Sequence, residues 1–458
     1  MFDEIIENNK DNIINSVCDL IKIPSVSEET EDPNLPFGNN CTEALNAILT
    51  LASSMGFKTK NIDNYCGYIE FGTGDELVGI IGHLDVVPAN VEDGWTTPPF
   101  SPDIRDGKLF GRGSIDDKGP VIASLYAMKA IMDTTNVSKR VRLIVGLNEE
   151  KGWKCIDYYK AHEEWPSIGF SPDANFPAIY AEKGIMSLEL KNSFKLEDFD
   201  IVSIDCKGNA INVVPKYISI VLSSSKENIE NVMNLTSDNI SLSKVNDTTI
   251  KIESFGVAAH AAHPELGRNA IKQLVEFLVT NFKFTTNYLN NLYTSGLFDI
   301  ESPKFMSESL KLEDDSGVLT SNVASMDYID NKLIIRINLR VPVTISLDEI
   351  KSKYEIFNDD SNEFEILKLS TQDPLYVEKD TYLVKTLVEI FNSKTGLLAE
   401  PIAIGGGTYA RAFKNFVSYG ATMPGEKDMC HQVDEFIKID NLILSSKIYA
   451  EAIYELAK

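Results

Sequence analysis

The stretch Leu77–Ala89, LVGIIGHLDVVPA, gives the first strong indication of the fold. Its first half, LVGIIG, has the length and the apolar, β-branched character of a buried strand. An imidazole and a carboxylate, His83 and Asp85, follow where this run ends, in a chain that has only five histidines. We therefore expect a sheet whose strand ends carry functional side chains.

The same alternation of strand and helix patterns recurs along the chain. Short apolar runs predict further strands, and apolar residues at helical spacing predict amphipathic helices. Alternating strands and helices are typical of an α/β sheet covered on both faces. The predicted strands are 77–82, 140–147 and 401–406, and the predicted helices are 3–22, 41–56, 118–132 and 433–457.

The middle of the chain has a different, α+β character. Strand-like segments stand among Ser, Asn and Asp-rich connectors at 184–192, 217–224 and 332–341, with one strong helix at 267–282. The α/β pattern returns after residue 380, which predicts an inserted domain, 184–380, within a domain formed by 1–183 and 381–458. Asn-Val precedes an extended segment twice, at 212–213 and 322–323, as in two related subdomains.

Composition excludes several classes of partner. The 458 residues include 68 acidic and 43 basic ones, and the net charge of -25 repels nucleic acid and anionic membrane surfaces. The N-terminus lacks a signal-peptide pattern, and no apolar run approaches about 18 residues. The six cysteines show no CxxC pairing, which is typical of reduced thiols. We expect a soluble, cytoplasmic protein.

Acidic and imidazole side chains follow one predicted strand end after another. In an open α/β sheet these ends form the crevice where ligands bind. So many carboxylates in one crevice need a divalent cation to stay ionised. Imidazole with carboxylate favours zinc, manganese or cobalt, and the number of groups favours two ions about 3.5–4 Å apart. The candidates are His83, Asp85, Asp116, Glu149, Glu150, Asp173 and His431.

Each of these residues also has an ordinary structural interpretation. Asp116 can help to cap the helix that begins near Lys118. Glu149 and Glu150 fit the solvated first turn of a helix, and Asp173 fits a turn after Ser-Pro. The triplet Gly405–Gly407 lacks the Gly-Lys-Ser/Thr of a phosphate loop, so we interpret it as a close approach of backbone to a ligand. It is the recurrence of these groups at successive strand ends that favours a joint site.

Seven motifs span most of the chain: GHLDVVPA, GRGSIDDKGP, LNEEKGW, SPDANFP, AAHAAHPELGRNA, GGGTYARAF and MPGEKDMCHQVDE. In this order they resemble the two-metal aminoacylase and carnosinase family of metallopeptidases, most closely its bacterial PepV-type dipeptidases. The resemblance implies a zinc-peptidase-like catalytic domain with a mixed sheet, and an inserted lid domain.

The resemblance also implies roles for the residues at the strand ends. One ion is held by His83, Asp116 and Asp173, and the other by Asp116, Glu150 and His431, so that Asp116 bridges them. Asp85 accepts a hydrogen bond from His83 and orients it. Glu149 is the general base that takes a proton from a water between the ions. A cis peptide bond joins Asp116 to Asp117.

In the predicted lid, the resemblance implies that His260 stabilises the oxyanion. Asn212 and Arg340 are implied to hold the carboxylate of the substrate, for which the Arg fork is well shaped. We expect Gly406, Gly407 and Thr408 to contribute further substrate contacts. These lid residues require closure of the insertion, which predicts hinges near residues 183 and 381.

The predicted function is hydrolysis of unblocked dipeptides by a water that bridges two divalent cations. Zinc is the first choice, with manganese or cobalt as alternatives, and the doubled lid predicts a monomer. Two other functions stay open: deacylation of N-acyl amino acids at the same metal centre, and metal-dependent ligand binding without catalysis. A glycosidase that uses Glu149 and Glu150 is disfavoured, because adjacent residues of an extended segment point apart.

Overall fold

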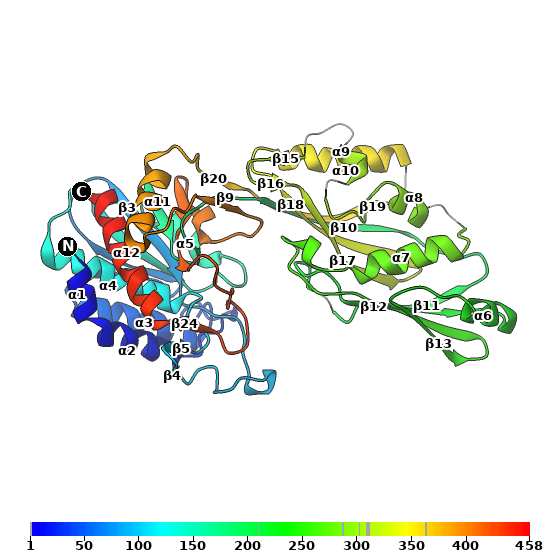
Figure 1. The fold of residues 1–458 in the computed structure, drawn as a ribbon, viewed down its shortest axis with the longest axis horizontal. Coiled ribbons are helices and arrows are strands. Elements are labelled where there is room, and N and C mark those ends of the chain that lie inside the picture. The colour runs from blue at the N-terminus through cyan, green and yellow to red at the C-terminus, as the bar shows by residue number, and fades with distance from the viewer. Residues whose placement is uncertain (1, 209, 286–287, 302, 308–311, 362–363) are drawn as a thin grey trace. The chain divides into compact units, whose positions relative to one another are not determined.

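The computed structural model describes residues 2–208, 210–285, 288–301, 303–307, 312–361 and 364–458. The chain divides into two compact units (Figure 1). The first unit comprises Met1–Tyr180, Tyr376–Ile402 and Gly407–Lys458, and the second comprises Ala181–Leu375 and Ala403–Gly406. The sequence pattern predicts divisions after 183 and 380, and it gives no sign that 403–406 groups with the second unit.

A nine-stranded mixed sheet forms the centre of the first unit. Its order is β1-β2-β6-β3-β7-β22-β9-β20, with β21 paired to β9. The central strands β6, β3, β7 and β22 are parallel, whereas β1, β2 and β9 pair antiparallel. The strands are β1 Lys58–Ile62, β2 Cys66–Phe71, β3 Leu77–His83, β6 Arg140–Gly146, β7 Ile168–Ser171, β9 Ile179–Glu182, β20 Leu375–Tyr376, β21 Ile402–Ile404 and β22 Phe416–Ser418.

Chain segments cover both faces of this sheet, as the sequence predicts. Gly82 and His83 are consecutive in β3 and so face opposite sides. A Cβ on Gly82 would lie 2.5 Å from Val121 of the helix α4. The ring of His83 contacts Tyr409, in the short 3-10 helix η3 (Tyr409–Ala412), on the other face.

Helix α4 is the most deeply buried helix element around the sheet. Its residues are buried almost throughout, from Lys118 to Met128, and such all-round burial needs apolar side chains on every face. It packs against α12, α2 and β3, while α3 packs against β1 and β2 and α5 against β2. The helices of this unit are α1 Asp3–Asn8, α2 Lys10–Ile21, α3 Asn39–Ser54, α4 Lys118–Thr134, α5 Lys154–His162, α11 Tyr382–Thr395 and α12 Ile439–Ala457.

Two predicted helices differ from the structure. The helix predicted over 3–22 is interrupted at Asn9, whose side-chain amide donates to the carbonyl of Ile5 at 2.9 Å; asparagine competes in this way for helical backbone groups. The helix predicted over 433–457 begins only at Ile439, because Phe436–Lys438 forms strand β24 and pairs with β5.

Two small sheets complete the first unit. One has the order β24-β5-β4 and the other pairs β23 with β8. Strands β5, β8 and β24 of these sheets are next in sequence to the loops that carry Asp116, Asp173 and His431, respectively. The strands are β4 Asp103–Arg105, β5 Lys108–Phe110, β8 Ala174–Asn175, β23 Ala421–Thr422 and β24 Phe436–Lys438, and a 3-10 helix η1 spans Val91–Asp93.

The second unit holds two four-stranded antiparallel sheets, β17-β18-β10-β19 and β11-β12-β14-β13. Side chains of both sheets belong to one hydrophobic core, into which α7 also packs. The strands are β10 Gly184–Ser193, β11 Asp200–Asp205, β12 Tyr217–Ser223, β13 Ile240–Asn246, β14 Thr249–Phe255, β15 Glu313–Asp314, β16 Gly317–Val318, β17 Thr320–Ile329, β18 Lys332–Val341 and β19 Glu365–Gln372. The helices are α6 Lys226–Met233, η2 Pro264–Leu266, α7 Ala270–Asn281, α8 Tyr288–Thr294, α9 Lys304–Ser307 and α10 Leu347–Ser361.

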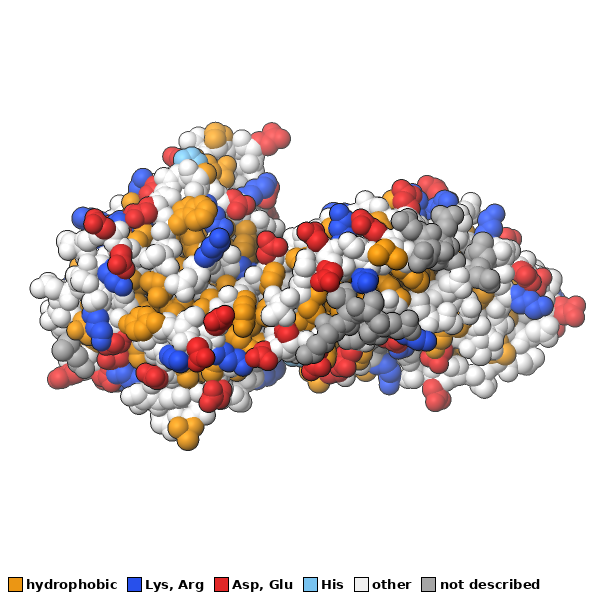
Figure 2. Space-filling view, turned by 90° about the horizontal axis from the view of Figure 1, so that it is seen from above, with side chains coloured by type: hydrophobic (Ala, Val, Ile, Leu, Met, Phe, Trp, Pro, Cys, Tyr) orange, Lys and Arg blue, Asp and Glu red, His pale blue; other side chains and the backbone are white. Residues whose placement is uncertain are grey.

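Figure 2 shows acidic and basic side chains interspersed over the visible face of both units. Within the described ranges, no helix combines the length and the apolar character needed to cross a membrane.

Removal of one buried ion pair should destabilise the first unit. Arg142 of β6, 4% exposed, donates to Glu70 Oε2 of β2 at 2.8 and 2.6 Å. Glu70→Ala leaves this guanidinium buried without its counter-charge, so we expect a loss of about 3 kcal/mol in the free energy of unfolding. Urea unfolding of the metal-free protein, followed by circular dichroism, measures the loss.

The matched control is Asp19→Ala, which removes an exposed partner of Lys22. Exposed pairs contribute less than about 1 kcal/mol. Equal losses in the free energy of unfolding for the two variants would contradict the prediction that the buried pair contributes more than the exposed one.

Candidate metal centre

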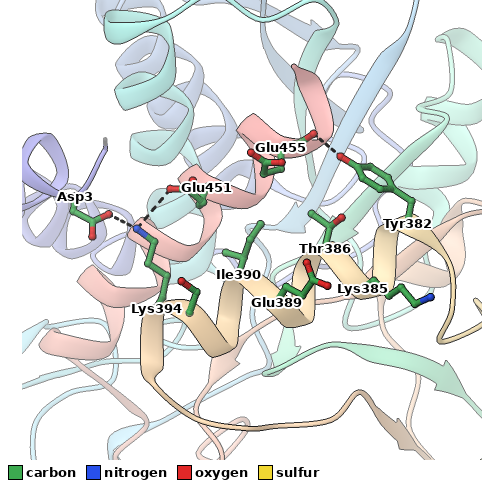
Figure 3. A pocket seen from close by; sticks show the side chains of 10 residues that line it. Asp3, Tyr382, Lys385, Thr386, Glu389, Ile390, Lys394, Glu451 and Glu455 are labelled. Atoms are coloured by element: carbon green, nitrogen blue, oxygen red, sulfur yellow. Dashed lines mark hydrogen bonds and ion pairs between the residues drawn. The ribbon is translucent and has the colours of Figure 1, made fainter.

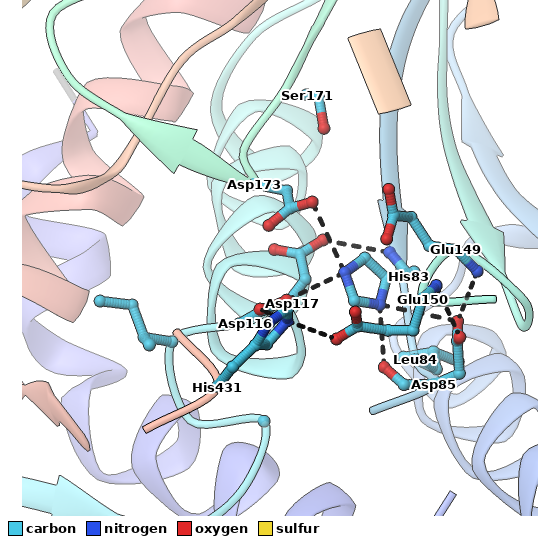
Figure 4. Close-up of polar contacts among 12 residues, drawn as sticks. His83, Leu84, Asp85, Asp116, Asp117, Glu149, Glu150, Ser171, Asp173 and His431 are labelled. Carbon is cyan, nitrogen blue, oxygen red and sulfur yellow. Dashed lines mark hydrogen bonds and ion pairs between the residues drawn. The ribbon is translucent and has the colours of Figure 1, made fainter. Parts of the chain in front are cut away.

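The predicted strand-end residues come together at the carboxyl ends of the parallel strands of the sheet (Figure 4). His83 ends β3, Glu149 and Glu150 follow β6, and Asp173 follows β7. These three strands are parallel neighbours, so their carboxyl ends meet. Asp116 lies just before α4, and His431 lies in the loop before β24.

Asp116 is the centre of this arrangement. Its Oδ1 lies 3.1 Å from His83 Nε2, and its Oδ2 lies 3.1 Å from His431 Nε2. Asp173 Oδ2 is 3.5 Å from His83 Nε2, and Glu150 Oε1 is 3.1 Å from His431 Nε2. Two groups of possible ligands result, and both include Asp116: His83 with Asp116 and Asp173, and Asp116 with Glu150 and His431.

Two residues hold His83 in place: Asp117, next to the start of α4, and Asp85, just after β3. Because residue 82 is glycine, α4 can approach β3 closely: a Cβ there would lie 2.4 Å from Asp117 Oδ2. This carboxylate accepts a hydrogen bond from the His83 backbone N–H at 3.0 Å. The His83 ring is completely buried, and its Nδ1 lies 2.8 Å from the backbone carbonyl oxygen of Asp85.

Asp85 supports the site differently from the prediction. Its carbonyl oxygen, and not its carboxylate, makes the short contact with His83 Nδ1; the carboxylate Oδ1 is 3.6 Å away. The reason is that β3 ends at His83, so residues 83 and 85 no longer follow strand alternation. The carboxylate instead accepts the backbone N–H groups of Glu149 and Glu150, at 3.1 Å each. Asp85 thereby ties the end of β6 to the end of β3.

The side chain of Glu149 is held by an indole. Trp153 Nε1 donates to Glu149 Oε1 at 3.2 Å. Trp153 itself has φ 66°, in the left-handed region that bulky residues seldom adopt. Its ring packs edge-on against Tyr409, with ring centres 5.3 Å apart. The position of Glu149 thus depends on a local backbone turn and on η3.

Burial and mutual charge shift the pKa values of this cluster. Burial lowers the pKa of each imidazole, but the facing carboxylates outweigh it: they raise the pKa of His83 well above its ordinary value and that of His431 to about 11. Burial raises the pKa of Asp116, but the two imidazoles more than offset this, so its pKa is lowered. Burial raises the pKa of Glu149 and of Glu150.

The residues fit divalent cations. A carbonyl oxygen can only accept, so the neutral His83 imidazole carries its proton on Nδ1 and directs the Nε2 lone pair at the carboxylates. Nε2 is buried and makes no well-aligned hydrogen bond, as expected of a metal ligand. The candidate ligand atoms of each group lie within 4.8 Å of one another. The predicted cis peptide bond between Asp116 and Asp117 is present.

The predicted lid residues Asn212, His260 and Arg340 all lie in the second unit. The backbone N–H of Ala261, next to His260, donates to the carbonyl of Asn212 at 2.8 Å. Arg340 is 4% exposed and donates to Asn338 Oδ1 and to the carbonyl of Gly405. A Cβ on Gly405 would lie 2.7 Å from Ala262, so this glycine links the two groups.

The glycine triplet and Thr408 have mainly structural surroundings. At Gly405 the close approach is to Ala262 of the same unit, whereas at Gly406 a Cβ would meet only Ile404, at 3.6 Å. A Cβ on Gly407 would lie 2.9 Å from Arg411. Thr408 is buried, and its hydroxyl oxygen accepts from the Ala410 N–H at the start of η3. The predicted substrate contacts of Gly406, Gly407 and Thr408 stay predictions.

A separate surface hollow lies along α11 and α12 (Figure 3). Lys394 there pairs with Asp3 at 2.6 Å and with Glu451 at 3.6 Å, and the Tyr382 hydroxyl donates to the Glu455 carbonyl. The hollow shares no residue with the metal-ligand groups, and histidine and cysteine are absent from the residues that line it. We therefore do not assign chemistry to it.

Three residues shape the site without a role predicted from the sequence: Asp117, Trp153 and Tyr409. The doubled acid at 116–117 and the aromatic residues of LNEEKGW and GGGTYARAF were visible. Their contacts were not, because Asp117 reaches across to β3 and Tyr409 comes from a distant segment.

The fold and the site belong to a class of peptidases. A model of peptidase family M20/M25/M40 matches residues 79–455, and the chain belongs to this family. The "Putative dipeptidase YtjP" of Bacillus subtilis is 37% identical and covers 98% of each chain. The "Beta-Ala-Xaa dipeptidase" of Lactobacillus delbrueckii subsp. lactis is 36% identical over 100% of this chain and 98% of its own. The resemblance to a metallopeptidase family with dipeptidase members is thereby confirmed.

Solved structures show the same fold at low identity. Human carnosine dipeptidase 1 superposes with a TM-score of 0.60 at 16% identity, covering 100% of this chain and 98% of its own. The dipeptidase Dug1p of Saccharomyces cerevisiae gives 0.58 at 14% identity, covering 99% and 98%. The predicted fold class, an α/β domain with an inserted domain, agrees with these matches.

Binding of metal should release protons from the two imidazoles. The carboxylates raise the pKa of both His83 and His431, so we expect both rings to be protonated at pH 7 in the metal-free protein. A metal ion needs the neutral ring, so zinc titration at pH 7 should release about two protons per chain, and zinc affinity should rise with pH. Calorimetry in buffers of different ionisation enthalpy counts the protons.

His431→Ala should lower the release by about one proton. The control His263→Ala removes an imidazole that pairs with Glu265 in the second unit and belongs to neither ligand group. If both variants released as many protons as the parent protein, this account of the imidazoles would be wrong.

Proposed function

We propose that this protein hydrolyses unblocked dipeptides at a centre of two divalent cations. One ion is held by His83, Asp116 and Asp173 and the other by Asp116, Glu150 and His431. The observation that carries the proposal is the double use of Asp116, whose two oxygens face two different imidazoles. A carboxylate in this position would serve as a ligand to both ions, since Asp116 belongs to both groups of possible ligands.

The donor set supports zinc first, with manganese or cobalt as alternatives. Two cations at these residues supply Lewis-acid polarisation of a carbonyl and a water of lowered pKa. Imidazole and carboxylate ligands leave the ions with open positions for substrate, because each group offers three protein ligands.

Glu149 is the proposed general base. It takes a proton from the attacking water and returns it to the amine of the leaving residue. Trp153 fixes one of its oxygens, and burial together with the charges of Asp173 and Glu150 raises its pKa. A raised pKa suits a group that must both accept and return a proton near neutral pH.

The preference for dipeptides rests on the two dipeptidase relatives, each similar over nearly the whole chain. We propose that Asn212 and Arg340 bind the substrate carboxylate and that His260 stabilises the oxyanion. These three residues all lie in the second unit, as expected if they bind the same substrate. The hinges near 183 and 381, the monomeric state and the cytoplasmic location stay predictions.

A substrate panel separates the dipeptidase from the two other functions. We expect turnover of alanyl-alanine and none of N-acetyl-alanine, with loss of activity in 1,10-phenanthroline and recovery on addition of zinc or manganese. Preferred turnover of N-acetyl-alanine would favour the deacylase. Binding of either compound without turnover, in the metal-loaded protein, would favour a non-catalytic binding protein. A β-alanyl dipeptide in the same panel tests whether the protein also hydrolyses a β-linked dipeptide.

Replacement of the proposed base should remove catalysis and preserve the metals. Glu149→Gln keeps the size of the side chain but cannot accept the proton, so we expect kcat to fall by about 10²–10⁴-fold. KM and the number of zinc ions per chain should change little. Stopped assays with alanyl-alanine and metal analysis measure these quantities.

The control Glu92→Gln changes an exposed glutamate of η1 in the same unit and should leave kcat unchanged. Full activity of Glu149→Gln, or a fall that is explained by lost zinc, would exclude Glu149 as the base.

A further inference from the structure

We infer that Glu435 is a positioning residue for the metal centre, which holds the loop of Asp116 against the loop of His431. Glu435 is completely buried, although it lies only four residues after the half-exposed His431. The inference deepens the proposed function and rests on it, because the residues that Glu435 would position are the proposed metal ligands.

The Glu435 carboxylate accepts hydrogen bonds from several backbone N–H groups of the Asp116 loop. Its Oε1 accepts the N–H groups of Gly113 and Ile115 at 3.0 Å each and that of Asp116 at 3.3 Å. Its Oε2 accepts from Arg112 Nη1 at 2.6 Å. One buried side chain therefore satisfies donors from 112, 113, 115 and 116, the segment that leads into the shared ligand.

The backbone around Glu435 makes the same connection. The Gly111 N–H donates to the Glu435 carbonyl at 3.0 Å, and β24 continues from there as the partner of β5, with Phe436 opposite Phe110. Side chain and main chain together therefore join residues 108–116 to residues 435–438. Asp116 ends one of these joined segments and His431 lies four residues before the other, and their ligand atoms are 3.1 Å apart.

This arrangement predicts an effect on the metals and not only on folding. Backbone N–H groups fixed by a buried carboxylate give Asp116 one position, so that its two oxygens face both imidazoles before any ion arrives. Groups that orient metal ligands in this way typically contribute 10–100-fold to metal affinity. Buried hydrogen bonds to a charged acceptor are also the strong ones.

The test compares Glu435→Gln and Glu435→Ala with the parent protein. The glutamine can still accept from the backbone, but its amide NH2 competes for the space at Arg112; the alanine removes every acceptor. We expect zinc dissociation constants raised about 10–100-fold in the alanine variant and less in the glutamine variant, with altered visible absorption of the cobalt-loaded proteins. Competitive titration with a zinc chelator measures the constants.

The matched control is Asp434→Asn, the neighbouring acid, which accepts from Thr96 N and Oγ1 and contacts no proposed ligand. It should bind zinc as the parent does. Thermal unfolding of all metal-free variants separates stability from affinity. A lower melting temperature for Glu435→Gln, with zinc affinity and cobalt spectrum unchanged, would make Glu435 merely structural and overturn the inference.

Hydrogen exchange in the unsubstituted, metal-free protein gives a test that needs no variant to fold. The amides of Gly113, Ile115 and Asp116 should exchange slowly, and fast exchange there would overturn the inference. A parent protein that binds two zinc ions while Glu435→Gln binds them equally well overturns this inference alone. A parent protein that binds no zinc overturns the proposed function as well.

Discussion

The position of the Asp116 carboxylate between two imidazoles is the interaction on which the rest of the site depends. Each oxygen faces one Nε2 at 3.1 Å, and the other acids of the cluster, Asp173 and Glu150, stand one on each side. Carboxylates gathered this closely repel one another and are costly to bury unless positive charge is placed among them. The raised pKa of His83 and of His431 favours protons on the imidazoles as this charge in the metal-free protein, and cations of higher charge can take their place.

The scaffold meets this constraint through close packing. Gly82 lets α4 approach β3, which brings Asp117 to the backbone of His83 and Asp116 to its ring. Asp85 then fastens the end of β6 to the end of β3. The backbones of His83, Glu149 and Glu150 are thus held by buried acids from other elements.

Solved structures with low sequence identity to this chain share its fold. The matched solved structures share only 14–16% of residues with this chain, yet they cover nearly all of it. Buried strands tolerate exchange among apolar residues of similar volume, whereas the order of strands decides which loops meet. A fold can therefore persist while most of its core side chains change.

Local sequence patterns are sufficient to predict the α/β character of the outer segments, the inserted α+β region and the candidate ligands, because apolar periodicity and polar residues at strand ends can be recognised without knowledge of the fold. The sequence also indicated roles through motif resemblance. Local patterns misjudged the break at Asn9 and the strand at Phe436–Lys438, where a side chain or a distant partner decides the conformation.

Only the tertiary structure decided which groups touch. It showed that the Asp85 carbonyl contacts His83 while the Asp85 carboxylate serves Glu149 and Glu150. It showed that Trp153 holds Glu149 and that Glu435 reaches the Asp116 loop. These contacts join residues up to 323 positions apart, and their geometry depends on the packing of whole elements, so no periodicity or motif spacing encodes them.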